Sequence, residues 1–268
     1  MADLDGIRSD LGAEHDALDA IVSGLSDDAW DVPTPAEPWS VRDQISHLAF
    51  FDELATAAAT SADDFMAGMA DAAQDVDAFM NGPLDKGRAM RPAEVLDWWR
   101  TARADMIKSF EGLDPAVRIP WYGPPMSPAS FMTARLMETW AHGQDVVDGL
   151  GIARPPTLRL RHVAHIGVRA RPFSYSTRGL DLPAEQVRVD LSGPGGERWT
   201  WNEDATQRIS GGALDFCLVV TQRRHVDDTA LTMDGPLARE WMAIAQAYAG
   251  PPGTGRAPGQ FSKRSARA

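Results

Sequence analysis

The chain has 268 residues, of which 44% are hydrophobic, so it can form one large or two ordinary domains with a sizeable core. Its formal net charge of −12 argues against nucleic acid or an anionic membrane as a partner, because both are bound by basic surfaces. The single cysteine, Cys217, excludes an intramolecular disulfide framework and a cysteine-rich zinc site.

The start of the sequence, Met-Ala-Asp-Leu-Asp-Gly, is acidic and lacks the basic segment and apolar run that are typical of a signal peptide. No stretch of the sequence is long and apolar enough to span a bilayer. Together with the low cysteine content, these features predict a cytoplasmic protein.

The first half of the chain predicts a series of helices. Apolar residues between positions 3 and 25 recur at spacings of three, four and seven, which indicates an amphipathic helix. After a proline-containing loop, Ser40 and Asp43 have the spacing of a capping box, so a second helix should begin at Ser40. Its apolar stripe consists of Ile45, Leu48, Phe51 and Leu54.

Three further features precede the middle of the chain. A third helix is predicted over 62–80 and should be broken by Asn81-Gly82-Pro83. Pro92 suits the first position of the next helix, which should end near Gly112. A loop over 120–128, rich in proline and aromatic residues, then enters a helix that includes 132–147, and this loop is either a wall of a substrate pocket or a packed surface turn.

The second half mixes helices and strands. Apolar residues alternate with polar ones at 187–191 and again at 199–201, which predicts a hairpin around a turn at 194–196. The apolar run 214–220 fits a helix or a strand by periodicity, and Gly211-Gly212 after a possible cap at Ser210 favours a helix. The remaining predictions are a helix over 157–170, a short strand over 229–233 and a last helix from Pro236 to Tyr248.

Three residues predict a metal site. Glu138 and His142 are four residues apart, so on a helix their side chains lie on one face and can reach one ion. His47 lies beside the apolar stripe of the second helix and is the candidate for a third ligand. Taken singly, such a histidine is more often a core side chain, and a Glu–His pair is more often solvated. Helix bundles, however, build metal sites from inward-facing side chains of neighbouring helices, which favours a shared site.

These residues lie in two motifs that resemble a known family. The segments Pro38-Trp-Ser-Val-Arg-Asp-Gln-Ile-Ser-His47-Leu-Ala and Glu138-Thr-Trp-Ala-His142-Gly-Gln-Asp145-Val resemble the metal-binding motifs of the mycothiol-dependent maleylpyruvate isomerase family. That family belongs to the DinB/YfiT-like superfamily of metal-binding four-helix bundles. The resemblance covers roughly residues 1–150 with specific motifs and is looser beyond them.

The resemblance implies an α+β fold class with two domains. Residues 1–152 should form a DinB-like metal-binding four-helix bundle, and residues 153–250 a small α/β domain with a sterol-carrier-like shape. The remaining residues, 251–268, are rich in proline, glycine, lysine and arginine with almost nothing to bury, which predicts a disordered tail.

The resemblance also implies the chemistry. The family's ligands fall on His47, Glu138 and His142, its characteristic metal is zinc, and the open fourth position receives a thiol such as mycothiol. The protein would then isomerise a small electrophilic substrate or transfer sulfur to it. Mycothiol as the thiol cosubstrate would imply an actinobacterial source.

Other residues are candidates for roles around this site. Asp145 shares a helix face with Glu138 and His142 and could orient a ligand or act as a base, with exposure at the helix end as the alternative. Asp43 could accept a hydrogen bond from His47, although its capping role already explains it. Arg223 or Arg224 could hold a substrate carboxylate, as the resemblance implies, or could simply cap a helix C-terminus. Three further histidines are predicted to lie on helix surfaces: His15, His162 and His165.

Two other classes of function remain open from the sequence. One is a metal-dependent hydrolase or lyase that needs no thiol. The other is a non-catalytic protein in which the metal stabilises the bundle and the second domain binds a small molecule. The open three-ligand site favours an enzyme over this last alternative.

Overall fold

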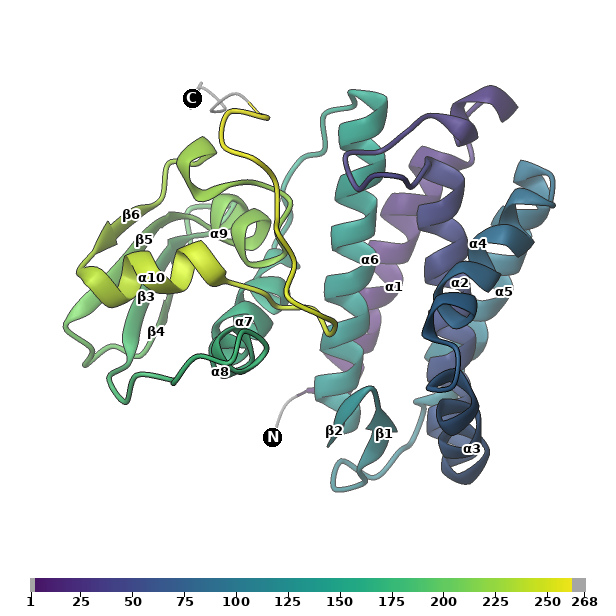
Figure 1. The fold of residues 1–268 in the computed structure, drawn as a ribbon, viewed down its shortest axis with the longest axis horizontal. Helices are drawn as coiled ribbons and strands as arrows, with labels where there is room; N and C mark the ends of the chain where they lie inside the picture. The colour runs from purple at the N-terminus through teal and green to yellow at the C-terminus, as the bar shows by residue number, and fades with distance from the viewer. Residues whose placement is uncertain (1–2, 262–268) are drawn as a thin grey trace. The chain divides into compact units, whose positions relative to one another are not determined.

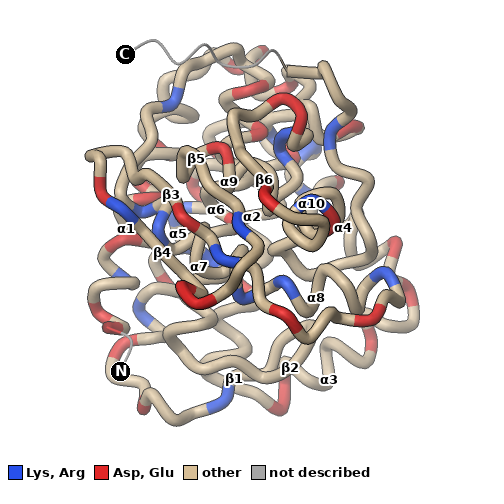
Figure 2. Tube along the Cα trace, turned by 90° about the vertical axis from the view of Figure 1, so that its left-hand side faces the viewer, with Lys and Arg blue, Asp and Glu red and all other residues tan. Residues whose placement is uncertain are grey.

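The computed structural model describes residues 3–261. The chain divides into two compact units, Met1–Arg154 and Pro155–Ala268. The first unit is mostly helical and the second combines helices with a four-stranded sheet, which confirms the predicted mixture of helices and sheet. Acidic and basic residues lie scattered along the described trace (Figure 2), and the expectation that nucleic acid is not a partner stays a prediction.

Four long helices form the frame of the first unit (Figure 1). Helix α2 packs against both α5 and α6, and α1 packs against α6. Their bounds are α1 (Leu4–Val22), α2 (Val41–Thr60), α5 (Pro92–Ser109) and α6 (Pro128–Leu150). Within the described residues, no helix combines the length and the apolar character needed to cross a membrane.

The apolar faces of these helices meet in a continuous core, which explains why they pack in this way. Side chains from α1, α2, α5 and α6 are almost fully excluded from solvent, and burying each large one contributes roughly 1.5–3 kcal/mol. The cluster includes Leu18, Val22, Trp30, Val41, Ile45, Leu48, Val95, Trp99 and Val146.

The start of α2 is fixed by the predicted capping box, which the structure confirms. The Ser40 hydroxyl accepts a hydrogen bond from the Asp43 backbone N–H at 3.3 Å, and the Asp43 carboxylate accepts one from the Ser40 backbone N–H at 2.9 Å. Two of the N–H groups that a helix start leaves without partners are thereby satisfied. The cap sets the position of the turns that carry Gln44 and His47.

The segment between α2 and α5 differs from the prediction. Two helices, α3 (Ala62–Ala72) and α4 (Val76–Arg88), replace the single helix over 62–80. The break comes at 73–75, where the Asp75 side chain caps α4 by accepting from Ala78 N–H at 2.9 Å. Pro83 lies inside α4 rather than ending it. A proline costs the helix one hydrogen bond, and we infer that packing of its buried ring offsets this loss.

The segment over 120–128, predicted as a loop, is largely a short hairpin. Strands β1 (Ile119–Trp121) and β2 (Gly123–Met126) pair antiparallel, with Ile119 opposite Met126. The hairpin leads directly into α6, where the Ser127 side chain accepts from Ser130 N–H. It therefore holds Trp121 and Tyr122 against the helical frame, where both are partly exposed.

The second unit is built on a sheet with strand order β4-β3-β5-β6. The predicted hairpin is confirmed, since Val189 pairs with Trp201 and Leu191 with Trp199 in antiparallel register. The predicted helix over 214–220 is also confirmed as α9. The elements are α7 (Leu160–Arg169), α8 (Arg171–Ser176), β3 (Val187–Ser192), β4 (Arg198–Trp201), β5 (Gln207–Gly212), α9 (Ala213–Val220), β6 (Thr232–Asp234) and α10 (Pro236–Ile244), with short 3-10 helices at Asp27–Asp31 and Val226–Asp228.

Strand β5 is absent from the sequence prediction, and Ser210 lies within it rather than at a helix cap. β5 pairs in parallel with β3 and antiparallel with β6, so it occupies an interior position in the sheet. Ile209 is its one buried apolar residue. The strand therefore depends on its two neighbours for stability, and it has too little apolar alternation to be predicted from its own residues.

The described part of the predicted tail makes specific contacts within the second unit. The backbone N–H groups of Gly259 and Phe261 donate hydrogen bonds to the Asp228 carboxylate. The Arg224 guanidinium lies 3.6 Å from the centre of the Phe261 ring. Disorder over 251–268 stays a prediction, and residues 262–268 lie outside the described residues.

Replacing Ser40 tests the cap on which the position of α2 depends. We expect Ser40→Ala to lower the free energy of unfolding by about 1 kcal/mol, because the N–H of Asp43 loses its acceptor. Ser61→Ala is the matched control, since Ser61 occupies the same cap position of α3 but accepts no hydrogen bond from its helix backbone. Urea unfolding measures both changes, and equal losses in the two variants would contradict the role of the cap.

Candidate metal centre

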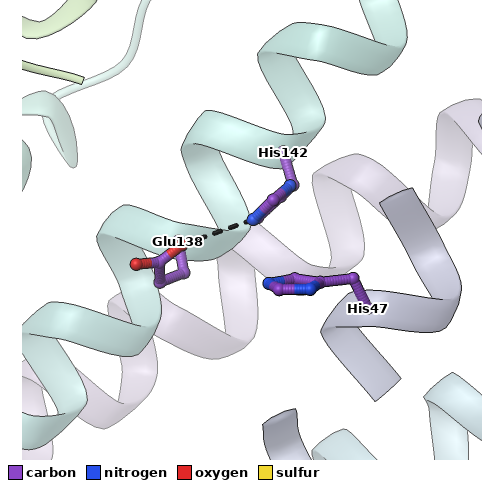
Figure 3. A group of neighbouring side chains, drawn as sticks. All are labelled: His47, Glu138 and His142. Carbon is purple, nitrogen blue, oxygen red and sulfur yellow. Dashed lines mark ion pairs between the residues drawn. The ribbon is translucent and has the colours of Figure 1, made fainter. Parts of the chain in front are cut away.

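His47, Glu138 and His142 come together between α2 and α6 (Figure 3). Each side chain offers one ligand atom, and these atoms all lie within 4.8 Å of one another. His142 Nε2 is 3.3 Å from Glu138 Oε2, as the four-residue spacing predicts. Because α2 packs against α6, His47 faces the other two residues from the opposite helix.

The side chain of Gln44 fixes the orientation of His142. Gln44 Oε1 lies 2.6 Å from His142 Nδ1. An amide oxygen can only accept a hydrogen bond, so Nδ1 carries the proton and donates it. In the neutral imidazole, Nε2 then has a free lone pair on the side of Glu138. This is the tautomer that a metal ion needs when it binds through Nε2.

Two further hydrogen bonds fix the orientation of the Gln44 amide. The Thr34 hydroxyl donates to the Trp39 carbonyl at 2.8 Å, and so has lone pairs left with which to accept. Gln44 Nε2 donates to this hydroxyl at 2.9 Å, which turns Oε1 toward His142. The loop before α2 thus determines, through Thr34 and Gln44, which nitrogen of His142 is available.

Aromatic rings enclose the two histidines. The Trp39 ring stacks on His142 with centroids 5.9 Å apart and an interplanar angle of 15°, and it also contacts His47 at 4.9 Å. Phe51, one turn after His47, lies 4.4 Å from the His47 ring. These rings pack against both imidazoles and limit their movement.

A buried ion pair joins the two helices that carry the site. Arg135 Nε and Nη2 both donate to Asp52 Oδ1, at 3.1 and 2.8 Å. Asp52 is fully buried and Arg135 is 3% exposed. Burial raises the pKa of the Asp52 carboxyl, while the charge and hydrogen bonds of Arg135 act in the opposite direction. Arg135 precedes Glu138 by one turn, so the ion pair restricts sliding of α6 past α2.

His15, predicted to lie on a helix surface, is instead buried in the first unit. Its ring contacts Trp99 edge to face at 5.9 Å. Burial lowers the pKa of His15, and the nearby charges of Arg103 and Arg135 lower it further, so the imidazole is neutral. Of the other two histidines, His162 is partly exposed and His165 is exposed.

The structure also decides between alternatives for Asp145 and Asp43, and it shows the environment of Cys217. Asp145 is fully buried, so the alternative that it is exposed at the helix end is wrong. Asp43 serves as the cap of α2 and accepts from Arg88 Nε at 2.9 Å. Cys217 is buried, which raises the pKa of its thiol and keeps it protonated. A nucleophilic role for Cys217 is therefore disfavoured.

Arg223 and Arg224 follow α9 in the second unit. Arg223 donates to the Thr221 carbonyl, and its guanidinium lies 5.9 Å from the centre of the Tyr248 ring. Arg224 is buried and donates to the Arg223 carbonyl. Their predicted role beside the metal site stays a prediction.

Sequence reasoning missed Gln44 and Thr34. Gln44 precedes His47 by three residues, so helical spacing places it on the same face, and this was the available signal. Thr34 could not be found in this way, because it lies in a loop whose path the helical pattern does not define.

The donor set fits a zinc ion. Two imidazoles and one carboxylate form a common protein ligand set of catalytic zinc, and a hydrogen-bonded second ring nitrogen is the usual support of a histidine ligand. His47, Glu138 and His142 supply the donor set, and Gln44 supplies the support of His142.

Comparisons with known proteins agree on one family. A family model described as the mycothiol maleylpyruvate isomerase N-terminal domain matches residues 11–147. Uncharacterised proteins from two strains of Mycobacterium tuberculosis are 45% identical to this chain over 257 residues, covering 96% of this chain and 100% of each relative. These mycobacterial relatives agree with the expected actinobacterial source.

Two solved structures resemble this chain in fold. They are a mycothiol-dependent maleylpyruvate isomerase, with a TM-score of 0.57 and 14% identity, and a mutant form of such an enzyme, with 0.58 and 13%. Each match covers 87% of this chain and 95% of the other. At this identity the similarity shows the fold alone.

Removing the Gln44 hydrogen bond tests its role in orienting His142. We expect Gln44→Leu to weaken zinc binding by about 10–100-fold, the usual effect of losing such a support, because Nδ1 of His142 loses its acceptor. Competition with a chromophoric chelator measures the affinity. Gln144→Leu is the matched control, since Gln144 lies on α6 and hydrogen-bonds Asp148 rather than the site. Unchanged affinity in Gln44→Leu would contradict this role.

Proposed function

This chain belongs to the family defined by the mycothiol maleylpyruvate isomerase N-terminal domain, and on that premise we propose that it is a zinc- and thiol-dependent enzyme. The thiol would be mycothiol or a similar low-molecular-weight compound. The reaction would be isomerisation of a small electrophilic substrate or transfer of the sulfur to it. The observation that carries this proposal is the convergence of His47, Glu138 and His142 on one point.

In this proposal these three side chains hold the metal. A zinc ion with two histidines and one carboxylate keeps a position open, which distinguishes catalytic from structural zinc. When bound, the ion would lower the pKa of a thiol in that position from its free value of about 8.5.

The protein's own contribution is to prepare the ligands. Gln44 holds the proton of His142 on Nδ1 and leaves Nε2 free. Trp39 and Phe51 pack on the two imidazole rings and limit the access of water to their faces. The Asp52–Arg135 ion pair ties together the helices from which the three ligands project. The ligand geometry is thus formed before any substrate binds, which is the arrangement that catalysis favours.

We assign supporting roles to three further residues. Asp145 is buried and lies on α6 three residues after His142, a spacing suited to orienting a ligand or accepting a proton. Where the substrate carries a carboxylate, Arg223 or Arg224 would hold it, a role for which a planar guanidinium is well suited. Of these two roles, the one for Asp145 has the more direct support, because its helix carries two of the proposed metal ligands.

The same proposal extends to the architecture. We infer that residues 1–152 correspond to the DinB-like four-helix bundle, supported by the packing of α1, α2, α5 and α6. We infer that residues 153–250 correspond to the small sterol-carrier-like α/β domain, supported by the mixed sheet with its helices.

Elemental analysis of the purified protein tests the metal site. We expect about one zinc per chain in the wild type, and loss of this zinc in His47→Ala and in His142→Ala, because two protein ligands bind zinc poorly. His162→Ala, on a partly exposed histidine of the second unit, should keep the metal.

The enzymatic part of the proposal needs a second measurement. Turnover of an electrophile should require both zinc and added thiol, and it should be lost in His142→Ala while circular dichroism shows an intact fold. Metal retained in both ligand variants would refute the site. Turnover that is indifferent to thiol would instead support a hydrolase or lyase.

A further inference from the structure

Three partly exposed aromatic rings gather beside the candidate metal site. Phe51 comes from α2, Phe79 from α4, and Tyr122 from the turn between β1 and β2. Their centroids lie 6.2 Å apart for Phe51 and Phe79, 6.1 Å for Phe51 and Tyr122, and 5.7 Å for Phe79 and Tyr122. We call these three residues the aromatic wall. Phe51 connects the wall to the site, because its ring is 4.4 Å from that of His47.

Further rings support the wall from behind. Trp121 contacts Phe51 at 6.2 Å and Tyr122 at 5.0 Å, and it stacks on Phe65 with an interplanar angle of 5°. Trp121 also packs on Phe131, a fully buried residue of α6, at 4.7 Å. The three outer rings are therefore held in place while part of each stays accessible, so they form a preformed apolar surface.

The wall carries no charge at neutral pH. Burial raises the pKa of Tyr122 to about 12, so its phenol stays protonated. Such a surface favours flat, apolar groups, because aromatic contacts add to the gain from burying apolar area.

The cations of the surrounding helices are already engaged. Arg42 of α2 pairs with Asp31, Arg88 of α4 with Asp43, and Arg135 of α6 with Asp52. Lys86 of α4 lies 3.7 Å from the centre of the Trp98 ring. A substrate carboxylate beside the wall would have to compete with these partners for a cation of these helices.

The nearby charge is also mostly negative. The stretch from α3 to α4 carries six aspartates against Lys86 and Arg88, at positions 63, 64, 71, 75, 77 and 85. In the metal-free protein, Glu138 adds a further carboxylate at the site itself. An anionic substrate would be repelled by this surplus, whereas an uncharged one would not.

We propose that the electrophile is an uncharged molecule with an aromatic or planar unsaturated body, which packs on the aromatic wall of Phe51, Phe79 and Tyr122. This assignment of a substrate class rests on the proposed function for the site. It separates this chain from an enzyme that acts on a small dicarboxylate. The reacting carbon would lie on the His47 side of the wall, and the apolar body would extend toward Phe79 and Tyr122.

Binding of three unreactive probes tests the substrate class. They are methyl 4-oxo-4-phenylbutanoate, its free carboxylate, and succinate; the first two differ in charge alone, and succinate lacks the ring and carries a second charge. Isothermal titration calorimetry at pH 7 gives each dissociation constant, before and after removal of metal with a chelator, because a carboxylate can also coordinate a metal. In the metal-free protein we expect the ester to bind at least about tenfold more tightly than the carboxylate, and succinate to bind most weakly.

Substitution of a ring locates the binding surface. Phe79→Leu keeps an apolar side chain but removes the ring. The ring contacts of Phe79 are with Phe50, Phe51 and Tyr122, not with the candidate ligand His47. We expect it to weaken binding of the ester by about three- to tenfold, with unchanged metal content and unchanged circular dichroism. Phe173→Leu, on a ring that is 36% exposed in the second unit, is the matched control and should bind the ester as the wild type does.

The outcomes separate this inference from the proposed function. The assigned substrate class would be overturned if the carboxylate or succinate bound the metal-free protein as tightly as the ester or more tightly. It would also be overturned if the ester did not bind, or if Phe79→Leu and Phe173→Leu weakened ester binding equally. If Phe79→Leu does not fold, the comparison of probes on the wild type still decides. The probes need neither zinc nor thiol, so absence of zinc or of thiol-dependent turnover would refute the proposed function alone.

Discussion

The contact between α2 and α6 determines whether the three candidate ligands form a site at all. His47 comes from one helix, while Glu138 and His142 come from the other. A shift of α6 by one residue along its axis would move its ligand atoms by about 1.5 Å and rotate them away from His47. The Asp52–Arg135 ion pair and the hydrogen bond between Gln44 and His142 both bridge these helices. The geometry of the site therefore depends on the same contacts that hold the helices together.

A buried ion pair is a weak means of stabilising a fold, so its presence here needs another explanation. Desolvating Asp52 and Arg135 costs several kcal/mol, and their attraction roughly offsets this loss. Apolar residues of similar volume would stabilise the helix pair as well. They would not, however, distinguish one register of α6 from the next, because apolar contacts are non-directional. Two N–H groups directed at one carboxylate oxygen allow one register, and that specificity is what a metal site with ligands on two helices requires.

The elements of the fold that the sequence predicted are those defined by local signals. The capping box at Ser40, the four-residue spacing of Glu138 and His142, and the alternation at 187–191 each act within a few residues, and each is found as predicted. The missed features depend on contacts between distant segments. β5 is stabilised by its neighbouring strands rather than by its own pattern, and α4 includes Pro83 because tertiary packing outweighs one lost hydrogen bond.

The same distinction holds at the site. Helical spacing brings Glu138 to His142, but only packing decides that His15 is buried and that Gln44, rather than Asp43, supports a ligand. The three candidate ligands and Gln44 occupy one short segment of α2 and one of α6. These two segments can stay unchanged while most of the remaining sequence changes. The aromatic wall consists of one ring each from α2, α4 and the hairpin before α6. Substitution of any one of these three rings therefore changes the surface on which a substrate would pack. Membership of a family therefore constrains the candidate ligands more tightly than it constrains the substrate.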